Sequence, residues 1–453
     1  MTIITDQKLI INENYEDQIN KHKIPTSKKK SIPYRDWRED QPVFKLPIEF
    51  CRFRLENGRI SIEVSSHKAT INPLDPNSPE DQKKIFGYLQ SSDREKNKVL
   101  SNLLKKDGQT SPAVITADGF LINGNRRRML LESLFNETYD EKFKFIDVCI
   151  LPGKNDPERP TLKDIAMLEY RYQVQDDGKS DYTEMAKAIT TRNYVNAGLP
   201  LPQMLRDDPK YSELDDKPFN RDVKAFERDY LGTLDLIDDY LSENQMVGNY
   251  KFMETRWESF KELNQKIMSK LKNDELDEKY LAKYNIDEDE IGDLRAACFN
   301  IIKLKNPQII NKNRHTDLIR AINPWLSNSK KEFLELAEIG DVSDEITNPR
   351  EREKKWEETK AELVENTVKK IQALSNKKKE QQGPINKLKQ ILSMLEHDYL
   401  DEDQIKRMPI PELDTAIKIT NSIQTANKSL QQTFYDLKDN KSPHALKKHF
   451  ENK

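Results

Sequence analysis

One segment, residues 113–134 (AVITADGFLINGNRRRMLLESL), narrows the available folds more than any other part of the chain. Two short apolar runs flank an Asp118-Gly119 turn, and the second run leads through Asn123-Gly124-Asn125 into an amphipathic stretch. This order predicts a strand, a tight hairpin, a second strand, a glycine turn and a helix. We therefore expect a small mixed α/β unit in which a sheet packs against that helix.

Three consecutive arginines, Arg126, Arg127 and Arg128, open the predicted helix. The first turn of a helix carries unbonded N–H groups and a partial positive charge, so each cation there is disfavoured by roughly a few tenths of a kcal/mol. Phosphate would offset this repulsion, because helix N-termini after glycine turns bind it and arginine adds bidentate hydrogen bonds. The alternative is pairing within the protein, since Arg128 and Glu132 are spaced i, i+4. Successive helical residues fan out by about 100°, so we expect two arginines to face a ligand and one to face solvent or the core edge.

The same residues carry a family resemblance. Lys106-Asp107-Gly108, residues 112–115 (PAVI), Asp118-Gly119 and residues 122–127 (INGNRR) follow one another as in the N-terminal domain of the ParB/sulfiredoxin superfamily, which they resemble. Residues 57–60 (NGRI) and 164–169 (DIAMLE) resemble two flanking motifs of that domain, and the similarity covers about residues 44–200 and continues more loosely to about residue 330. The resemblance implies that fold and a phosphate or nucleotide site. The implied site comprises Arg59, Gly124, Asn125, Arg126, Arg127 and Glu169.

Departures from the family pattern bear on activity. Nucleotide-hydrolysing ParB proteins usually have glutamate after the glycine, and sulfiredoxins have a nucleophilic cysteine, whereas this chain has Asn125. An amide serves neither as a general base nor as a nucleophile. Of the second family motif only Glu169 is in register. We therefore expect binding rather than hydrolysis, with CTP and Mg²⁺ implied by analogy; weak CTPase-like or nuclease activity rests on the resemblance alone, and no catalytic residue is assigned.

The chain length of 453 residues predicts two to four domains, and 34% charged residues against 35% hydrophobic ones favour long exposed helices. The expected class is α+β: a small α/β domain followed by a large all-α region that ends in a coiled coil or helical bundle. The expected parts are a polar N-terminal arm (1–43), a ParB-like α/β domain (44–155), a helical domain (156–345) and charged C-terminal helices (346–453).

Within the α/β region, residues 44–48, 51–55 and 145–151 read as strands, and residues 80–89 and 94–106 read as helices. Ser78 before Pro79 would cap the first helix and Gly108 would end the second. Residues 59–64 fit either a further strand or the start of a helix. The polar residues before position 43 predict a loosely docked arm, and its lysine triplet (28–30) reads as solvated or, alternatively, as a contact for nucleic acid.

Residues 182–241 are the candidate helix-turn-helix. Apolar residues at helical spacing follow one face of residues 219–237, and the opposite face carries side chains suited to reading base edges: Asn220, Arg221, Lys224 and Arg228. Accompanying aspartates and a connection of more than 20 residues favour a plain helical scaffold instead. Both interpretations stay open.

Beyond Pro349, apolar residues at near-heptad spacing predict a helix that stops at Gln382-Gly383-Pro384. Two more helices fit residues 385–400 and 411–437. Short loops between long amphipathic helices indicate an antiparallel coiled coil or bundle, which would join a protein partner or a second copy of the chain.

Composition limits the remaining classes. The net charge of −3 excludes a global polycation, so any DNA contact has to be a local patch. Three dispersed cysteines and histidines without ligand spacing predict a reducing compartment and no metal site. Without a signal segment or an 18-residue apolar run, we expect a cytoplasmic protein with no membrane contact. Three functions remain: a ParB-like nucleotide-responsive protein that binds DNA, a nucleic-acid-acting enzyme such as a nuclease or a modification or phage-defence component, and a degenerate ParB fold that serves as an interaction module.

Overall fold

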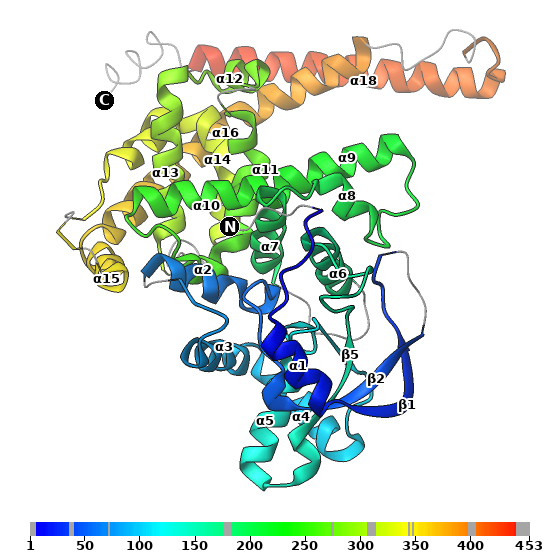
Figure 1. Ribbon diagram of the computed structural model, residues 1–453. Coiled ribbons are helices and arrows are strands. Elements are labelled where there is room, and N and C mark those ends of the chain that lie inside the picture. Colours follow the sequence, from blue (N-terminus) through cyan, green and yellow to red (C-terminus); the bar gives the residue numbers. More distant parts are fainter. Residues whose placement is uncertain are drawn as a thin grey trace. The chain divides into compact units, whose positions relative to one another are not determined.

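The computed structural model describes residues 6–35, 40–70, 73–174, 183–272, 276–305, 314–342, 345–346, 348–396 and 405–440 (Figure 1). The chain forms two compact units, Met1–Ser375 and Asn376–Lys453. Each is described by itself below. No helix of the described ranges combines the length and the apolar character that a membrane span requires.

The first unit contains a five-stranded mixed sheet. Its strands are β1 (Ile24–Ser31), β2 (Asp40–Pro47), β3 (Ala113–Ile115), β4 (Leu121–Asn123) and β5 (Phe145–Ile150). They lie in the order β1-β2-β5-β3-β4, in which β3 runs parallel to β5 and the other neighbours are antiparallel. The prediction of a small mixed α/β part followed by a large helical region is confirmed, and the β3–β4 hairpin leads into a helix as expected.

Helices cover both faces of the sheet. On one face lie α1 (Glu13–His22), α3 (Pro79–Ser91), α4 (Arg94–Asp107) and α5 (Asn125–Thr138), whose apolar residues share one buried cluster with the strands. On the other face, α6 (Leu162–Val174) packs Ile165 and Leu168 against Val114 and Ile122. Alternate residues of β3 and β4 thus enter opposite cores, as strand geometry requires.

The N-terminal region differs from the expected loose arm. Ile19 of α1 is fully buried, and β1 pairs with β2 along the sheet edge. All but one side chain of β1 is exposed, so its sequence lacks the apolar alternation that marks a strand. Backbone hydrogen bonds hold it instead, and its lysines are typical of an edge strand that avoids further pairing. One of them, Lys28, lies 2.8 Å from Asp147 of β5.

Residues 51–55 are also not the expected strand. Arg52 makes only an isolated bridge to Phe120, after a 3-10 turn at Ile48–Phe50. The open alternative for residues 59–64 resolves to helix: a 3-10 turn at Gly58–Ile60 leads into α2 (Ser61–Thr70). The helix α2 packs against α7 (Glu184–Asn196). The segment before α2, residues 51–57, therefore connects the sheet to the helical region.

The rest of the first unit is helical. A large apolar core joins most of its helices, and it includes Leu234, Phe260, Leu294 and Ile322. The further helices are α8 (Leu201–Arg206), α9 (Asp216–Phe226), α10 (Gly232–Glu243), α11 (Trp257–Lys266), α12 (Glu278–Tyr284), α13 (Ile291–Lys303), α14 (His315–Leu334) and α15 (Pro349–Thr359). Short 3-10 turns lie at Glu141–Lys144, Tyr250–Phe252, Glu254–Arg256, Met268–Lys270, Glu288–Glu290 and Glu335–Glu338.

The helix-turn-helix candidate contains more helices than expected. Its long connection includes α8, and the second helix is α9 and α10 joined by a π-helical turn, Glu227–Leu231. The first helix begins at Glu184 with Thr183 as its N-cap. Position 182, where the candidate begins, lies outside the described residues.

The C-terminal boundary lies later than predicted. Trp356 of α15 and Val364, Val368 and Ile371 of α16 (Ala361–Glu396) belong to the core of the first unit, so the break follows Ser375 rather than residue 345. The predicted stop at residues 382–384 is wrong, because α16 continues through Pro384. Residues around Pro384 are mostly exposed, so water can bond the backbone carbonyl that the proline leaves unpaired. The last described helix is α18 (Ile410–Asn440).

Candidate functional site

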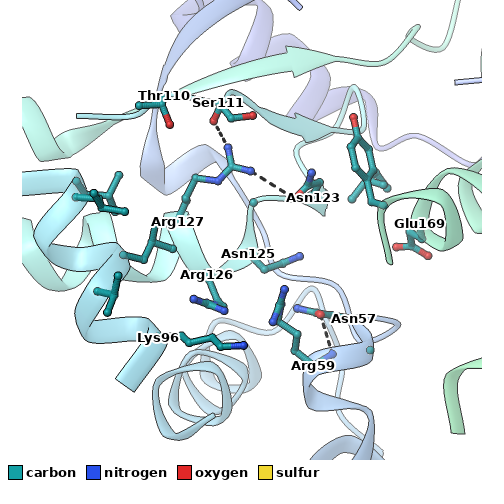
Figure 2. Close-up of a pocket in the computed structure, with 18 of the residues that line it drawn as sticks. Asn57, Arg59, Lys96, Thr110, Ser111, Asn123, Asn125, Arg126, Arg127 and Glu169 are labelled. Carbon is teal, nitrogen blue, oxygen red and sulfur yellow. Dashed lines mark hydrogen bonds between the residues drawn. The ribbon is translucent and has the colours of Figure 1, made fainter. Parts of the chain in front are cut away.

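A cavity of about 870 Å³ lies at the N-terminal end of α5 (Figure 2). All six residues of the predicted phosphate site line it, although they come from three separate segments. Five of the lining side chains are cationic and three are acidic. The cations are Lys30, Arg59, Lys96, Arg126 and Arg127, and the acids are Glu56, Asp107 and Glu169.

Gly124 sets the close approach of the backbone at this site. Its φ is +101°, and a Cβ there would lie 2.5 Å from the Cβ of Ala113 on β3. Every other residue would therefore be strained and would collide with the sheet. Gly124 is the N-cap of α5 and offers no side chain to its first N–H groups, whose intrahelical partners are also missing. The helix begins as an uncapped positive end at the cavity wall.

The three arginines have separate roles. Arg126 and Arg127 line the cavity, whereas Arg128 pairs with Glu132 at 2.7 Å and stacks over Phe53. Arg127 donates hydrogen bonds to the carbonyl oxygen of Ser111 and to Oδ1 of Asn123, and burial lowers its pKa to about 10. Contacts within the protein, the alternative to a ligand, therefore account for Arg128 and in part for Arg127.

Two asparagines present polar atoms without partners at the same opening. Asn125 is 7% exposed, and its Oδ1 has no hydrogen-bond partner within the described structure. Nδ2 of Asn57 also has no hydrogen-bond partner there, while Oδ1 of Asn57 accepts a hydrogen bond from the backbone N–H of Arg59 at 3.1 Å. Figure 2 shows Asn125, Asn57 and Arg59 around one opening with Arg126 and Lys96. Buried polar atoms cost free energy when unbonded, so these two atoms are suited to a polar ligand.

Glu169 is held by the protein itself. Its Oε1 lies 2.9 Å from Nε of Arg54, and its Oε2 accepts a hydrogen bond from the Tyr194 hydroxyl at 2.9 Å. Burial raises the pKa of Glu169 to about 7, against the opposing effect of Arg54. Arg54 also pairs with Glu56 at 3.3 Å. The sequence analysis missed Arg54, because it lies in the segment assigned to a strand.

A second cavity of about 860 Å³ shares the side chains of Glu56 and Glu169 with the first. Arg54 and Tyr194 line only this second cavity, so the Arg54–Glu169–Tyr194 group stands between the two. Apolar residues from the N-terminal segment, α2 and α6 form much of its wall, among them Ile10, Val64 and Ile165.

An apolar wall completes the first cavity. Val99 and Leu103 of α4 are 60% and 49% exposed, and both line the cavity with Ile122 and Tyr172. Sequence reasoning missed Lys96, Val99 and Leu103. The available signal was the second apolar stripe of α4, since Val99 and Leu103 are spaced i, i+4 beside the core positions.

The residues expected to contact DNA lie elsewhere. Asn220, Arg221, Lys224 and Arg228 are exposed, as predicted, and line neither cavity. Arg221 pairs with Asp222 at 3.3 Å, and Arg228 pairs with Asp229 at 2.6 Å. Neighbouring aspartates therefore neutralise two of the three cations.

Metal and thiol ligands are not gathered near the cavity. In the described ranges, no three His, Cys, Asp or Glu side chains are grouped to hold a metal ion. Cys51, Cys149 and Cys298 are buried, and burial raises the pKa of Cys51 to about 12 and that of Cys149 to about 11. Thiols in this state are poor nucleophiles.

Comparison of the chain with protein-family models, with curated proteins and with solved structures found no match. The site is therefore defined by its own geometry. It is a partly apolar cavity with an excess of cationic side chains, built on a glycine turn and the uncapped start of a helix.

Proposed function

We propose that the cavity at the start of α5 binds the phosphate groups of a nucleotide. The observation that carries this proposal is that five cationic side chains line the same cavity as the uncapped N-terminus of α5. Helix N–H groups and guanidinium groups both favour phosphate oxygens. Gly124 removes the Cβ that would hold a ligand away from the backbone.

A nucleotide fits better than a free phosphate ion. The volume of about 870 Å³ is of the size that accommodates small organic ligands. Val99, Leu103 and Tyr172 provide an apolar surface for a base or sugar, while Asn57 and Asn125 provide a donor and an acceptor. CTP is the first nucleotide to test, because of the resemblance to ParB-like domains.

Within this proposal Arg126, Arg59 and Lys96 contact the phosphates directly. Arg127 is a positioning residue, because its guanidinium group ties α5 to the carbonyl of Ser111. A magnesium ion would enter with the triphosphate, and Glu169 would reach it only after release from Arg54. We do not extend the proposal to bond cleavage, since residue 125 is an amide and the Glu169 carboxyl is already bound by Arg54 and Tyr194.

Two lysines of α4 give a matched test. Lys96 lines the cavity and Lys98 does not, although both are exposed on the same helix. We expect Lys96→Ala to weaken binding of CTP in isothermal titration about tenfold, since a hydrogen bond to a charged group contributes about 1.5 kcal/mol. Lys98→Ala should leave the affinity within about twofold, because the charge it removes is screened by solvent.

The comparison also controls for general electrostatic attraction. Equal losses in the two lysine variants would show nonspecific attraction to a basic surface and would contradict the assignment. Arg126→Ala tests a second phosphate contact, and unchanged CTP binding in that variant would also contradict the assignment. Titrations with CTP, ATP and inorganic phosphate, each with Mg²⁺ and with a chelator, identify the ligand class.

A DNA-binding role for α9 stays outside the proposal. The resemblance implies such a role, and the exposed side chains of Asn220 and Lys224 are compatible with it. The aspartates paired with Arg221 and Arg228 weaken the positive charge that phosphate contacts require.

A further inference from the structure

A regular apolar stripe runs along α18. Its positions are separated alternately by three and four residues, which is the spacing of the a and d positions of a heptad repeat. Six of these positions are apolar and two, Thr420 and Asn427, are polar; the apolar ones are Leu413, Ala416, Ile423, Leu430, Phe434 and Leu437. The pattern persists for more than three heptads, a length that is typical of coiled coils.

Nothing described in the second unit covers this stripe. Ile423, Leu430, Phe434 and Leu437 are 44%, 45%, 45% and 48% exposed. Exposed leucine and phenylalanine side chains each forgo about 1.5–3 kcal/mol of burial free energy. Exposed apolar side chains that repeat along one face of a helix mark a surface for association.

The second half of α16 is too short to be the partner. Residues 376–384 (NKKKEQQGP) contain no large apolar side chain, and the described apolar residues beyond them lie within 385–394. From Leu413 to Leu437 the stripe extends about 36 Å, whereas Ile385 to Met394 spans about 14 Å, at 1.5 Å per residue. A second α18 matches the stripe over its whole length.

Of the two polar positions in the stripe, Asn427 selects an arrangement. With Leu413 at a, Leu430 and Leu437 fall at d, and Asn427 falls at a. An asparagine at an a position is satisfied when it faces its own copy, whereas a shift of one heptad places Asn427 of one copy opposite Phe434 and buries its amide unpaired. We propose that α18 pairs with α18 of a second copy of this chain as a parallel, in-register coiled coil.

Light scattering on the full chain tests the pairing. The wild type is expected at twice the mass of one chain, and Leu430→Asp at the mass of one chain, because the substitution buries a carboxylate at d. Tyr435→Asp is the matched control: Tyr435 is 54% exposed on the same helix but occupies a b position, so the dimer should persist. A monomeric wild type, or a dimer that survives Leu430→Asp, would overturn the proposal.

Cross-linking tests the direction. The cysteines of the chain are all buried, so a cysteine introduced on α18 is the accessible thiol. Leu413→Cys and Leu437→Cys should each form a disulfide with its own copy under oxidation. In an antiparallel pair, disulfides would form only when the two variants are mixed, and that result would overturn the parallel arrangement.

Discussion

The group of Arg54, Glu169 and Tyr194 shows how individual side chains set the charge of the cavity. Glu169 has one oxygen on the guanidinium group and the other on the phenol, and these contacts do not fully offset its burial. Its pKa of about 7 lies above the ordinary value of 4.5, so the folded protein takes up a proton that the unfolded chain releases at neutral pH. The contribution of this group to stability is present at acidic pH and declines as pH rises through 7.

The same titration predicts a pH dependence of binding. As Glu169 ionises, the cavity loses net positive charge, so metal-free CTP should bind more weakly at pH 8 than at pH 6. The effect should be on the order of tenfold, which corresponds to two unit charges about 10 Å apart at an effective dielectric constant of 20. Titration calorimetry of the wild type beside Glu169→Gln measures it. The variant corrects for ionisation of the nucleotide, and parallel pH profiles of the two proteins would contradict the prediction.

At this scale, the residues that line the cavity were easier to predict from the sequence than the contacts that these residues make with one another. Gly124, Asn125 and the arginines were identifiable because a glycine turn before a basic helix has a local physical cause. Arg54 was not, since its partner is more than one hundred residues away and only the fold brings the two together.

At the scale of elements, a buried side chain of the neighbouring helix α11 bonds the π-helical turn between α9 and α10. Nδ2 of Asn264 on α11 donates a 2.6 Å hydrogen bond to the carbonyl oxygen of Arg228. Asn264 is 1% exposed, and Gly232 leaves room for it, since a Cβ there would lie 3.0 Å from that nitrogen. The wide turn thus exchanges a regular helical bond for a contact between neighbouring helices.

Removal of that contact should destabilise the helical core. We expect Asn264→Ala to lower the free energy of unfolding by about 1–3 kcal/mol, because it leaves a carbonyl without its partner. Urea denaturation measures the change. Asn220→Ala, at an exposed position of α9, should shift the free energy by less than about 0.5 kcal/mol. Equal effects of the two substitutions would show that the turn does not depend on Asn264.

Elements with a strong apolar period were predictable, and those held by other forces were not. The helices α3 and α4 and the strand β5 follow the expected ranges within a few residues. The strand β1 was not predicted, because backbone pairing rather than an apolar pattern holds its polar residues in the sheet. The continuation of α16 through Pro384 was not predicted either. The helix is exposed there, so water can replace the backbone hydrogen bond that proline cannot donate.

For the whole molecule, the boundary after Ser375 separates a unit with a large apolar core from helices whose apolar residues are exposed. Composition placed the break near residue 345, because charged helices begin there. Burial decides otherwise: α15 and the first part of α16 are charged on their outer faces, yet Trp356, Val364, Val368 and Ile371 are fully buried.

Two truncations distinguish these boundaries. A chain that ends at Ser375 should keep the thermal unfolding temperature of the first unit within a few degrees and should keep CTP binding. A chain that ends at Asn348 should unfold at a much lower temperature, because it loses four fully buried side chains that each contribute about 1.5–3 kcal/mol. Differential scanning calorimetry compares them, and similar unfolding of the two truncated chains would contradict the boundary.

The contact between Gly124 and Ala113 has a consequence for divergence of the chain. A Cβ at position 124 would lie 2.5 Å from the one at position 113, so a single small space is shared by a sheet residue and a site residue. Related chains could enlarge one position only by shrinking the other, and the positive φ of Gly124 forbids the exchange. The two positions should therefore stay small together in every related chain that keeps the glycine turn, and a bulky residue at position 113 would mark a relative in which the turn and the start of α5 have moved away from β3.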